Sequence, residues 1–233
     1  MLRERYPDAH CELAWSAPHE LLVATILSAQ STDVGVNRAT PELFCAFPTP
    51  ADYARAGADA IAPHVRSLNF WRMKARAVAE SMSAIVHRHG GEVPRSMDEL
   101  LALRGVARKT ANVVLGNAFG INVGVVVDTH VGRLSRRLGL SRHEDPIRVE
   151  RDLMALFPQD SWCELSHLLI FHGRRVCKAR GGACSEDAIC RRFCSEATPK
   201  AGRRAKAAKA GAQAAPSRHP RASTRQRPSR RRG

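Results

Sequence analysis

Residues 100–111 read Leu-Leu-Ala-Leu-Arg-Gly-Val-Ala-Arg-Lys-Thr-Ala and combine a short helix, a tight turn and the start of a second helix. Ser96, followed three residues later by Glu99, has the pattern of a capping box and predicts where the first helix begins. Gly105 gives the turn the backbone freedom that a helical hairpin needs. The second helix begins with outward-facing N–H groups at the positive end of its dipole. This stretch therefore predicts a binding site for one backbone phosphate of a nucleic acid.

Two ionisable residues lie where they can face that phosphate. Lys109 stands early in the second helix, and Asp128 follows an apolar run and precedes Thr129 and His130. Taken singly, such a lysine is usually a solvated charge and such an aspartate is usually a helix N-cap. Taken together, they form a candidate catalytic pair.

The composition favours a helical protein with one large domain or two small ones. The chain has 233 residues, of which 44% are hydrophobic and only 5% aromatic. Its net charge is +15, but twelve Lys and Arg residues and no acid lie from Ala197 onward. The first 196 residues therefore hold 25 basic residues against 22 acidic ones, a net charge of +3. The basic tail has no apolar periodicity, so we expect it to be disordered and to favour polyanions without specificity.

No apolar run reaches the roughly 18–20 residues of a membrane span, and the first residues lack the apolar core of a signal peptide, so we expect a cytoplasmic protein. Four of the seven cysteines lie within residues 177–194. In a reducing compartment this cluster indicates a metal site, whereas the scattered Cys11, Cys45 and Cys163 are typical of small core residues.

Helix signals follow one another along the chain. Residues 121–127 are strand-like but have no partner, so we expect a buried extended connector and an all-α fold. Ser161 with Glu164 has the pattern of a second capping box. The first predicted helix opens within residues 16–20 and ends near residues 28–31. The others, apart from the hairpin's first one, run over about 33–47, 52–61, 71–89, 109–119, 129–138, 146–157 and 162–172.

Five motifs follow one another along the chain. They are Ile26-Leu-Ser-Ala-Gln-Ser-Thr-Asp33, Gly91-Glu-Val-Pro94, Gly105-Val-Ala-Arg-Lys-Thr-Ala-Asn-Val-Val114, Val127-Asp-Thr-His130 and His172-Gly-Arg174. In this order they resemble the endonuclease III family of helix-hairpin-helix DNA glycosylases. The similarity covers roughly Leu13 to Cys194, and five ordered motifs are far more specific than one.

The resemblance implies a two-lobed, all-α helix-hairpin-helix DNA glycosylase fold with DNA bound between the lobes. One lobe, residues 12–122, would be a helical bundle that contains the hairpin. The other would join residues 1–11 to residues 123–196 and hold a [4Fe-4S] cluster in a C-terminal loop. Residues 197–233 would form the disordered basic tail.

The resemblance also implies a reaction. Lys109 matches the family's nucleophilic lysine and Asp128 its catalytic aspartate. Cleavage of an N-glycosidic bond builds positive charge on the sugar, which a carboxylate stabilises, and an amine at C1′ forms a Schiff base that permits β-elimination. The related adenine-mismatch glycosylases lack that lysine. We therefore expect a base-excision repair N-glycosylase with AP lyase activity on oxidised pyrimidines in duplex DNA.

A glycosylase must also extract its target base and fill the gap. Gln30 matches the family's gap-filling glutamine, and Phe70 stands where the family has an apolar wedge; the alternatives are a polar helix end and a core aromatic. The partner would be duplex DNA with damaged bases or abasic sites, bound by a monomer associated with the bacterial nucleoid. The other DNA-binding residues implied are Arg104, Gly105, Ala107, Arg108, Thr110 and His130.

The chain departs from the family in the hairpin and in the wedge loop. The family hairpin usually reads Leu-Pro-Gly-Val-Gly, whereas Arg104 replaces Pro and Ala107 replaces the second Gly here. If position 107 needs positive φ, alanine costs on the order of 1 kcal/mol and tilts the phosphate-binding amides, which a direct contact from Arg104 would offset. Asn69 stands where the family commonly has Gly; asparagine tolerates left-handed geometry better than most residues, so we expect the turn to be kept.

The cysteine spacing departs as well. The family has Cys-x6-Cys-x2-Cys-x5-Cys, whereas Asp187 takes the third position here. We expect four thiolates to hold a [4Fe-4S] cluster with a re-threaded loop, and structural zinc or no metal stay open as alternatives. The candidate ligands are Cys177, Cys184, Cys190 and Cys194.

Two other functions compete with the bifunctional enzyme. One is a divergent paralogue that binds damaged or branched DNA with weak or no turnover, because its hairpin and wedge are altered. The other is a non-enzymatic DNA binder driven by the basic tail. The intact pair of Lys109 and Asp128 favours the enzyme.

Overall fold

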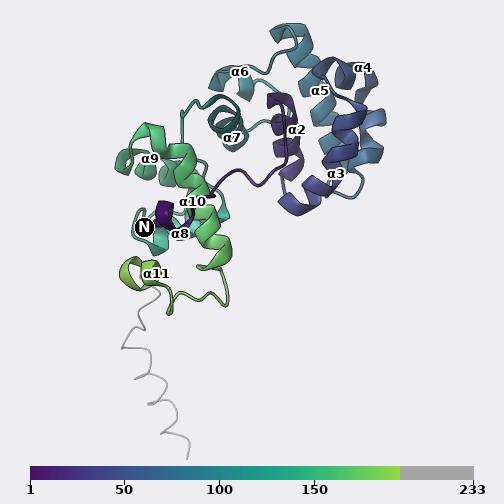
Figure 1. The fold of residues 1–233 in the computed structure, drawn as a ribbon. Coiled ribbons are helices and arrows are strands. Elements are labelled where there is room, and N and C mark those ends of the chain that lie inside the picture. Colours follow the sequence, from purple (N-terminus) through teal and green to yellow (C-terminus); the bar gives the residue numbers. More distant parts are fainter. Residues whose placement is uncertain (195–233) are drawn as a thin grey trace, which may run out of the picture. The chain divides into compact units, whose positions relative to one another are not determined.

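The computed structural model describes residues 1–194, and all the regular secondary structure in that range is helical (Figure 1). This confirms the all-α prediction, and residues 121–127 form the expected extended connector. No helix in this range is long and apolar enough to cross a membrane. The predicted tail lies outside the described residues. The α-helices are α1 (Leu2–Arg5), α2 (Pro18–Ser28), α3 (Asp33–Ala46), α4 (Pro50–Ile61), α5 (Trp71–His89), α6 (Met97–Leu101), α7 (Arg108–Phe119), α8 (Thr129–Arg137), α9 (Pro146–Leu156), α10 (Trp162–Arg175) and α11 (Ala188–Phe193), and the short 3₁₀ helices are η1 (Ala62–Val65) and η2 (Gln159–Ser161).

Most helices begin where a local signal predicts it. Thr32 accepts a hydrogen bond from the Gly35 N–H at the start of α3, and Ser96 accepts one from the Glu99 N–H at the start of α6. The start of α10 differs from the predicted capping box. Ser161 donates its hydroxyl to the carbonyl of Pro158 instead, so its side chain does not cap the helix.

A first hydrophobic core surrounds α2. Residues 21–27 of this helix are all buried, which is the pattern of a helix enclosed on every side. Figure 1 shows α2 beside α7, α5 and α3, and all three pack against it. The buried members of this core come from residues 13–115. The hairpin between α6 and α7 therefore packs against the helical bundle of the first core.

A second core lies among α8, α9 and α10, with buried members from Val125 to Cys194. Tyr6 packs with Leu168 and Phe171 in a small third cluster, which ties the N-terminal segment to α10. The lobes expected over residues 12–122 and over residues 1–11 with 123–196 stay a prediction, and residues 195 and 196 lie outside the described residues.

The cysteine segment contains a helix that periodicity did not reveal. Asp187 caps α11 by accepting hydrogen bonds from the N–H groups of Ile189 and Cys190, at 3.0 and 2.9 Å. The residue at the family's third cysteine position thus nucleates one short turn of helix, and that turn carries Cys190 inward, where it is fully buried.

Candidate functional site

The hairpin keeps its glycine geometry at only one position. Gly105 has φ of 76°, and a Cβ added there would stand 3.0 Å from the Cβ of Ala77. Ala107 has φ of −98° and is the N-cap of α7, so the condition for a strained alanine at this position, a positive φ, is not met. The turn is also held from behind, because the Ser81 hydroxyl donates to the Arg104 carbonyl at 2.6 Å. The start of α7 is therefore presented without a backbone penalty from the substitution.

Lys109 and Asp128 line the same two cavities. One is a narrow cavity of about 100 Å³ and the other a wider groove of about 1040 Å³; Asp33 and Arg174 line both as well. Lys109 comes from α7, which contributes to the first core, whereas Asp128 precedes α8 of the second core. The amine and the carboxylate thus meet at a recess between elements of the two cores.

Asp128 is also the N-cap of α8. Its Oδ1 accepts hydrogen bonds from the N–H groups of His130 and Val131, both at 2.8 Å. The two interpretations weighed for this residue are therefore compatible. Capping uses Oδ1 and fixes the carboxylate, while Oδ2 is left for the recess.

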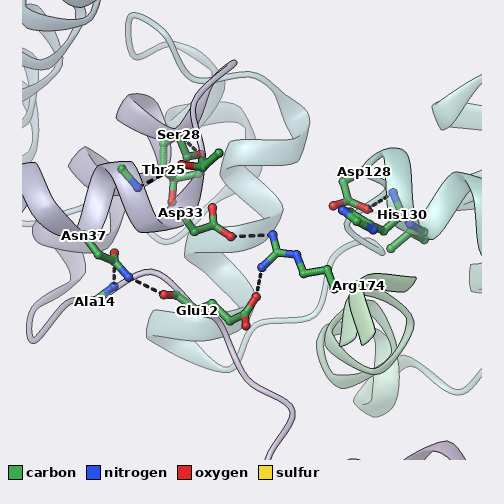
Figure 2. A network of polar contacts seen from close by, with 12 residues as sticks. Glu12, Ala14, Thr25, Ser28, Asp33, Asn37, Asp128, His130 and Arg174 are labelled. Carbon is green, nitrogen blue, oxygen red and sulfur yellow. Dashed lines mark hydrogen bonds and ion pairs between the residues drawn. The ribbon is translucent and has the colours of Figure 1, made fainter. Parts of the chain in front are cut away.

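An ion-pair network lies against this recess (Figure 2). Arg174 of α10 forms ion pairs with Glu12 and, at 2.6 Å, with Asp33. Burial raises the pKa of Asp33, Asp128 adds to the increase, and the Lys109 ammonium opposes it. These opposite effects show that Asp33 lies within electrostatic reach of both members of the candidate catalytic pair.

The two residues predicted to fill the gap left by the extracted base share an unusual backbone conformation. Gln30 and Phe70 are the only non-glycine residues at positive φ among residues 1–194, with values of 52° and 56°. Both are exposed, Phe70 by 58%. Such conformations cost free energy and concentrate at functional sites. The exposure of Phe70 argues against a core aromatic, and the roles of Gln30 and Phe70 in filling the gap stay predictions.

The two loops that carry these residues are joined. Asn69 donates from Nδ2 to the Gln30 carbonyl at 2.8 Å, and the residue of this loop at positive φ is Phe70 rather than Asn69. Lys74 is buried and donates from Nζ to Ser31 Oγ at 2.8 Å, and burial lowers its pKa. These two contacts join the loop that carries Gln30 to the loop and helix that carry Phe70.

The remaining predicted DNA-binding residues differ in how free they are. The Arg108 guanidinium donates twice to buried Glu150, at 2.8 and 3.1 Å, so its charge is already paired. Arg104 is exposed and reaches Glu80 at 3.4 Å. His130 lies against Arg133, with its Nδ1 at 3.1 Å from Nη2, and Thr110 is half-buried.

Three of the four predicted metal ligands converge. The Sγ atoms of Cys177, Cys184 and Cys190 lie within 4.8 Å of one another, whereas Cys194 lies outside that group although it is buried in the same core. Arg137 donates to Cys177 Sγ at 3.3 Å. Burial and the neighbouring thiols raise the pKa of Cys190. Two buried thiols and one half-buried thiol that converge, with a cationic N–H donor on one of them, fit a metal-bound thiolate site.

The sequence did not assign roles to Glu12, Asp33, Lys74 or Arg174. Asp33 and Arg174 stand inside the quoted motifs but are 141 residues apart, so only the fold reveals that they pair. Lys74 resembles any other basic residue of a helix until its burial is known. A signal for these residues would have required their spatial neighbours.

Comparisons with known proteins agree with this geometry. Residues 23–159 match the family model described as HhH-GPD superfamily base excision DNA repair protein. Endonuclease III of Synechocystis sp. is 52% identical over 186 residues, which cover 80% of this chain and 85% of the relative. Endonuclease III of Bacillus subtilis is 45% identical over 184 residues, covering 78% and 84%.

Solved structures share the fold of this chain. A trapped covalent intermediate of an endonuclease III with DNA superposes with a TM-score of 0.79 and 42% sequence identity, covering 84% of this chain and 92% of that one. A thermostable thymine-DNA glycosylase at 20% identity and a TM-score of 0.72 shares the fold. The chain therefore belongs to the HhH-GPD superfamily of base excision DNA repair proteins and, within it, to the endonuclease III family.

Proposed function

We propose that this protein is a bifunctional DNA glycosylase and AP lyase that removes oxidised pyrimidines from duplex DNA and acts as a monomer. The observation that carries the proposal is the shared recess, which Lys109 and Asp128 line from different cores. Membership of the endonuclease III family supports the same reaction. The proposal extends to the damaged-base substrate and to the roles of individual residues.

Lys109 is the nucleophile in this proposal. Its neutral amine attacks C1′, the N-glycosidic bond breaks, and the base leaves with the bonding electrons. Asp128 stabilises the positive charge that develops on the sugar and accepts the ammonium proton. The C1′–O4′ bond then opens, O4′ leaves with the electron pair and takes up a proton, and C1′ becomes the carbon of a Schiff base with Lys109. The Schiff base acidifies the C2′ proton, and transfer of this proton to a base expels the 3′ phosphate by β-elimination. A carboxylate without the amine would excise the base only.

DNA is gripped and opened by separate elements. The free N–H groups at the start of α7 bind one backbone phosphate, with Gly105 permitting close approach. Gln30 and Phe70, both exposed and at positive φ, enter the space that the extracted base leaves. The grip reads no sequence, so lesion choice rests on the recess.

Strand incision on a duplex with one abasic site or one thymine glycol tests the function. Lys109→Gln should lower incision by about 10²–10⁴-fold. Asp128→Asn should lower base release by a comparable factor. The exposed Lys178→Gln serves as the matched control and should incise like the parent. Tight binding to an abasic-site analogue with no incision of any lesion by the parent would instead identify a binding protein.

We also propose that Cys177, Cys184, Cys190 and Cys194 hold a [4Fe-4S] cluster. When bound, the cluster would cross-link the C-terminal loop to α10 and stabilise the second core. Iron and acid-labile sulfide in the purified protein test this, and zinc in their place would refute it. Cys194→Ser should lose iron. Cys45 is exposed and distant in sequence from the four candidate ligands, so Cys45→Ser should retain iron.

A further inference from the structure

His172 is a fully buried residue that contacts one of the converging thiols. Its Nε2 lies 3.3 Å from Cys190 Sγ, and its Nδ1 lies 2.9 Å from the Tyr6 hydroxyl. The ring is therefore held on both sides, by the N-terminal segment and by α11. Nothing in the proposed reaction uses this histidine.

The contacts decide which ring nitrogen carries the proton. A tyrosine hydroxyl donates readily, so Nδ1 of a neutral imidazole accepts from Tyr6 and the proton resides on Nε2. The Nε2–H then points at Cys190 Sγ. The hydrogen bond from Tyr6 thus selects the tautomer that donates to sulfur.

Asp187 does not compete for that proton. Its Oδ1 lies 3.9 Å from His172 Nε2, beyond hydrogen-bond distance, and already accepts two backbone N–H groups of α11. Its Oδ2 forms an ion pair with Arg5 at 2.6 Å. Asp187 therefore fixes the helix that carries Cys190, and the sulfur remains the acceptor for His172.

We propose that His172 is a positioning residue of the metal centre: it donates its Nε2–H to the Cys190 thiolate, holds that ligand in place and raises the cluster's reduction potential. A hydrogen bond to a ligand sulfur withdraws electron density and favours the more reduced cluster. Tyr6 acts through His172 by fixing its tautomer. The inference rests on the proposed [4Fe-4S] cluster, so its test first measures that cluster separately.

The experiment uses the full-length protein as purified. Iron and sulfide content of the parent establishes the cofactor, and redox titration with the visible spectrum as readout gives the potential. The variants are His172→Leu, which removes the donor, His172→Gln, whose amide N–H₂ can replace it, and Tyr6→Phe. The matched control is His167→Gln, a histidine of the same helix that lies near a scattered cysteine, with Nε2 3.6 Å from Cys163 Sγ.

The expected order of potentials separates a specific hydrogen bond from general packing. His172→Leu shifts the potential to more negative values, His172→Gln restores most of the shift, and His167→Gln leaves the potential unchanged. Tyr6→Phe shifts it in the same direction as Leu but less, and this variant decides the matter if His172→Leu does not fold. If the parent contains its full iron and His172→Leu has the same reduction potential as the parent, the role of His172 is overturned. If His172→Leu does not fold, the same result in Tyr6→Phe overturns it. A parent without iron overturns the cofactor itself.

Discussion

At the scale of single residues, Asp128 combines a structural and a chemical task in one carboxylate. Oδ1 caps α8, and the side chain lines the recess beside Lys109. Sequence alone presented these as alternatives, because a cap and a catalytic acid occupy the same kind of position before a helix. The structure permits both.

Two substitutions separate these tasks. Asp128→Asn keeps an oxygen for the N–H groups of His130 and Val131, so the free energy of unfolding should stay within about 0.5 kcal/mol of the parent while base release falls. Asp128→Ala should lose about 0.5–2 kcal/mol as well as activity. Urea denaturation beside a glycosylase assay measures both. Equal stability losses in the two variants would contradict the capping role.

His167 predicts a pH dependence of stability. Burial is the largest cause that lowers its pKa, to about 4, from an ordinary value near 6.5. Between these values the unfolded chain binds more protons than the folded chain, so stability falls as the pH falls through this window. We expect the parent to lose roughly 1–2 kcal/mol more than His167→Gln between pH 7 and pH 5. Urea denaturation at both pH values checks this, and parallel losses would exclude His167 as the cause.

At the scale of elements, the hairpin shows where sequence comparison misleads. Replacement of a family glycine by Ala107 predicts strain, but strain depends on φ, and φ is extended there. Position 105 carries the requirement instead, through both its positive φ and its contact with Ala77. The family motif shows which residues are common at each position, whereas the backbone φ shows at which position glycine is required.

A matched pair of variants tests this distinction. Gly105→Ala should destabilise the protein by about 1–3 kcal/mol and weaken binding to undamaged duplex, because positive φ and the close Ala77 Cβ both oppose a side chain. Ala107→Gly should change stability by less than about 0.5 kcal/mol and leave binding unchanged. Thermal unfolding and a binding titration at one salt concentration supply the comparison. Stronger binding by Ala107→Gly would restore the discarded interpretation.

At the scale of the molecule, local signals predicted the helices and a family resemblance predicted the reaction. Long-range pairs escaped both. The hydrogen bond from Asn69 to Gln30 and the contact of buried Lys74 with Ser31 depend on which segments the fold brings together. The roles of Lys109 and Asp128 remain predictions, although the fold places both on one recess.

Arg174 joins elements of the two cores. It comes from α10 and pairs with Glu12 and Asp33, which stand near the first core (Figure 2). Arg174→Ala leaves the partly buried Asp33 without this partner and should cost about 1–3 kcal/mol of stability. Base release should fall as well, because Asp33 lines the recess. The exposed Arg151→Ala on α9 is the control for lost charge, and an equal effect there would remove Arg174 from this role.

Borohydride reduction during the reaction with a thymine-glycol or abasic-site duplex examines the nucleophile directly. Reduction converts a Schiff base into a stable amine, so the protein should become covalently attached to DNA, and peptide mapping should place the sugar fragment on Lys109. Lys109→Ala should give no adduct, while Lys178→Ala should give as much as the parent. An adduct of equal yield in Lys109→Ala, or one mapped to another amine such as Lys74 or the N-terminus, would contradict the assignment of Lys109.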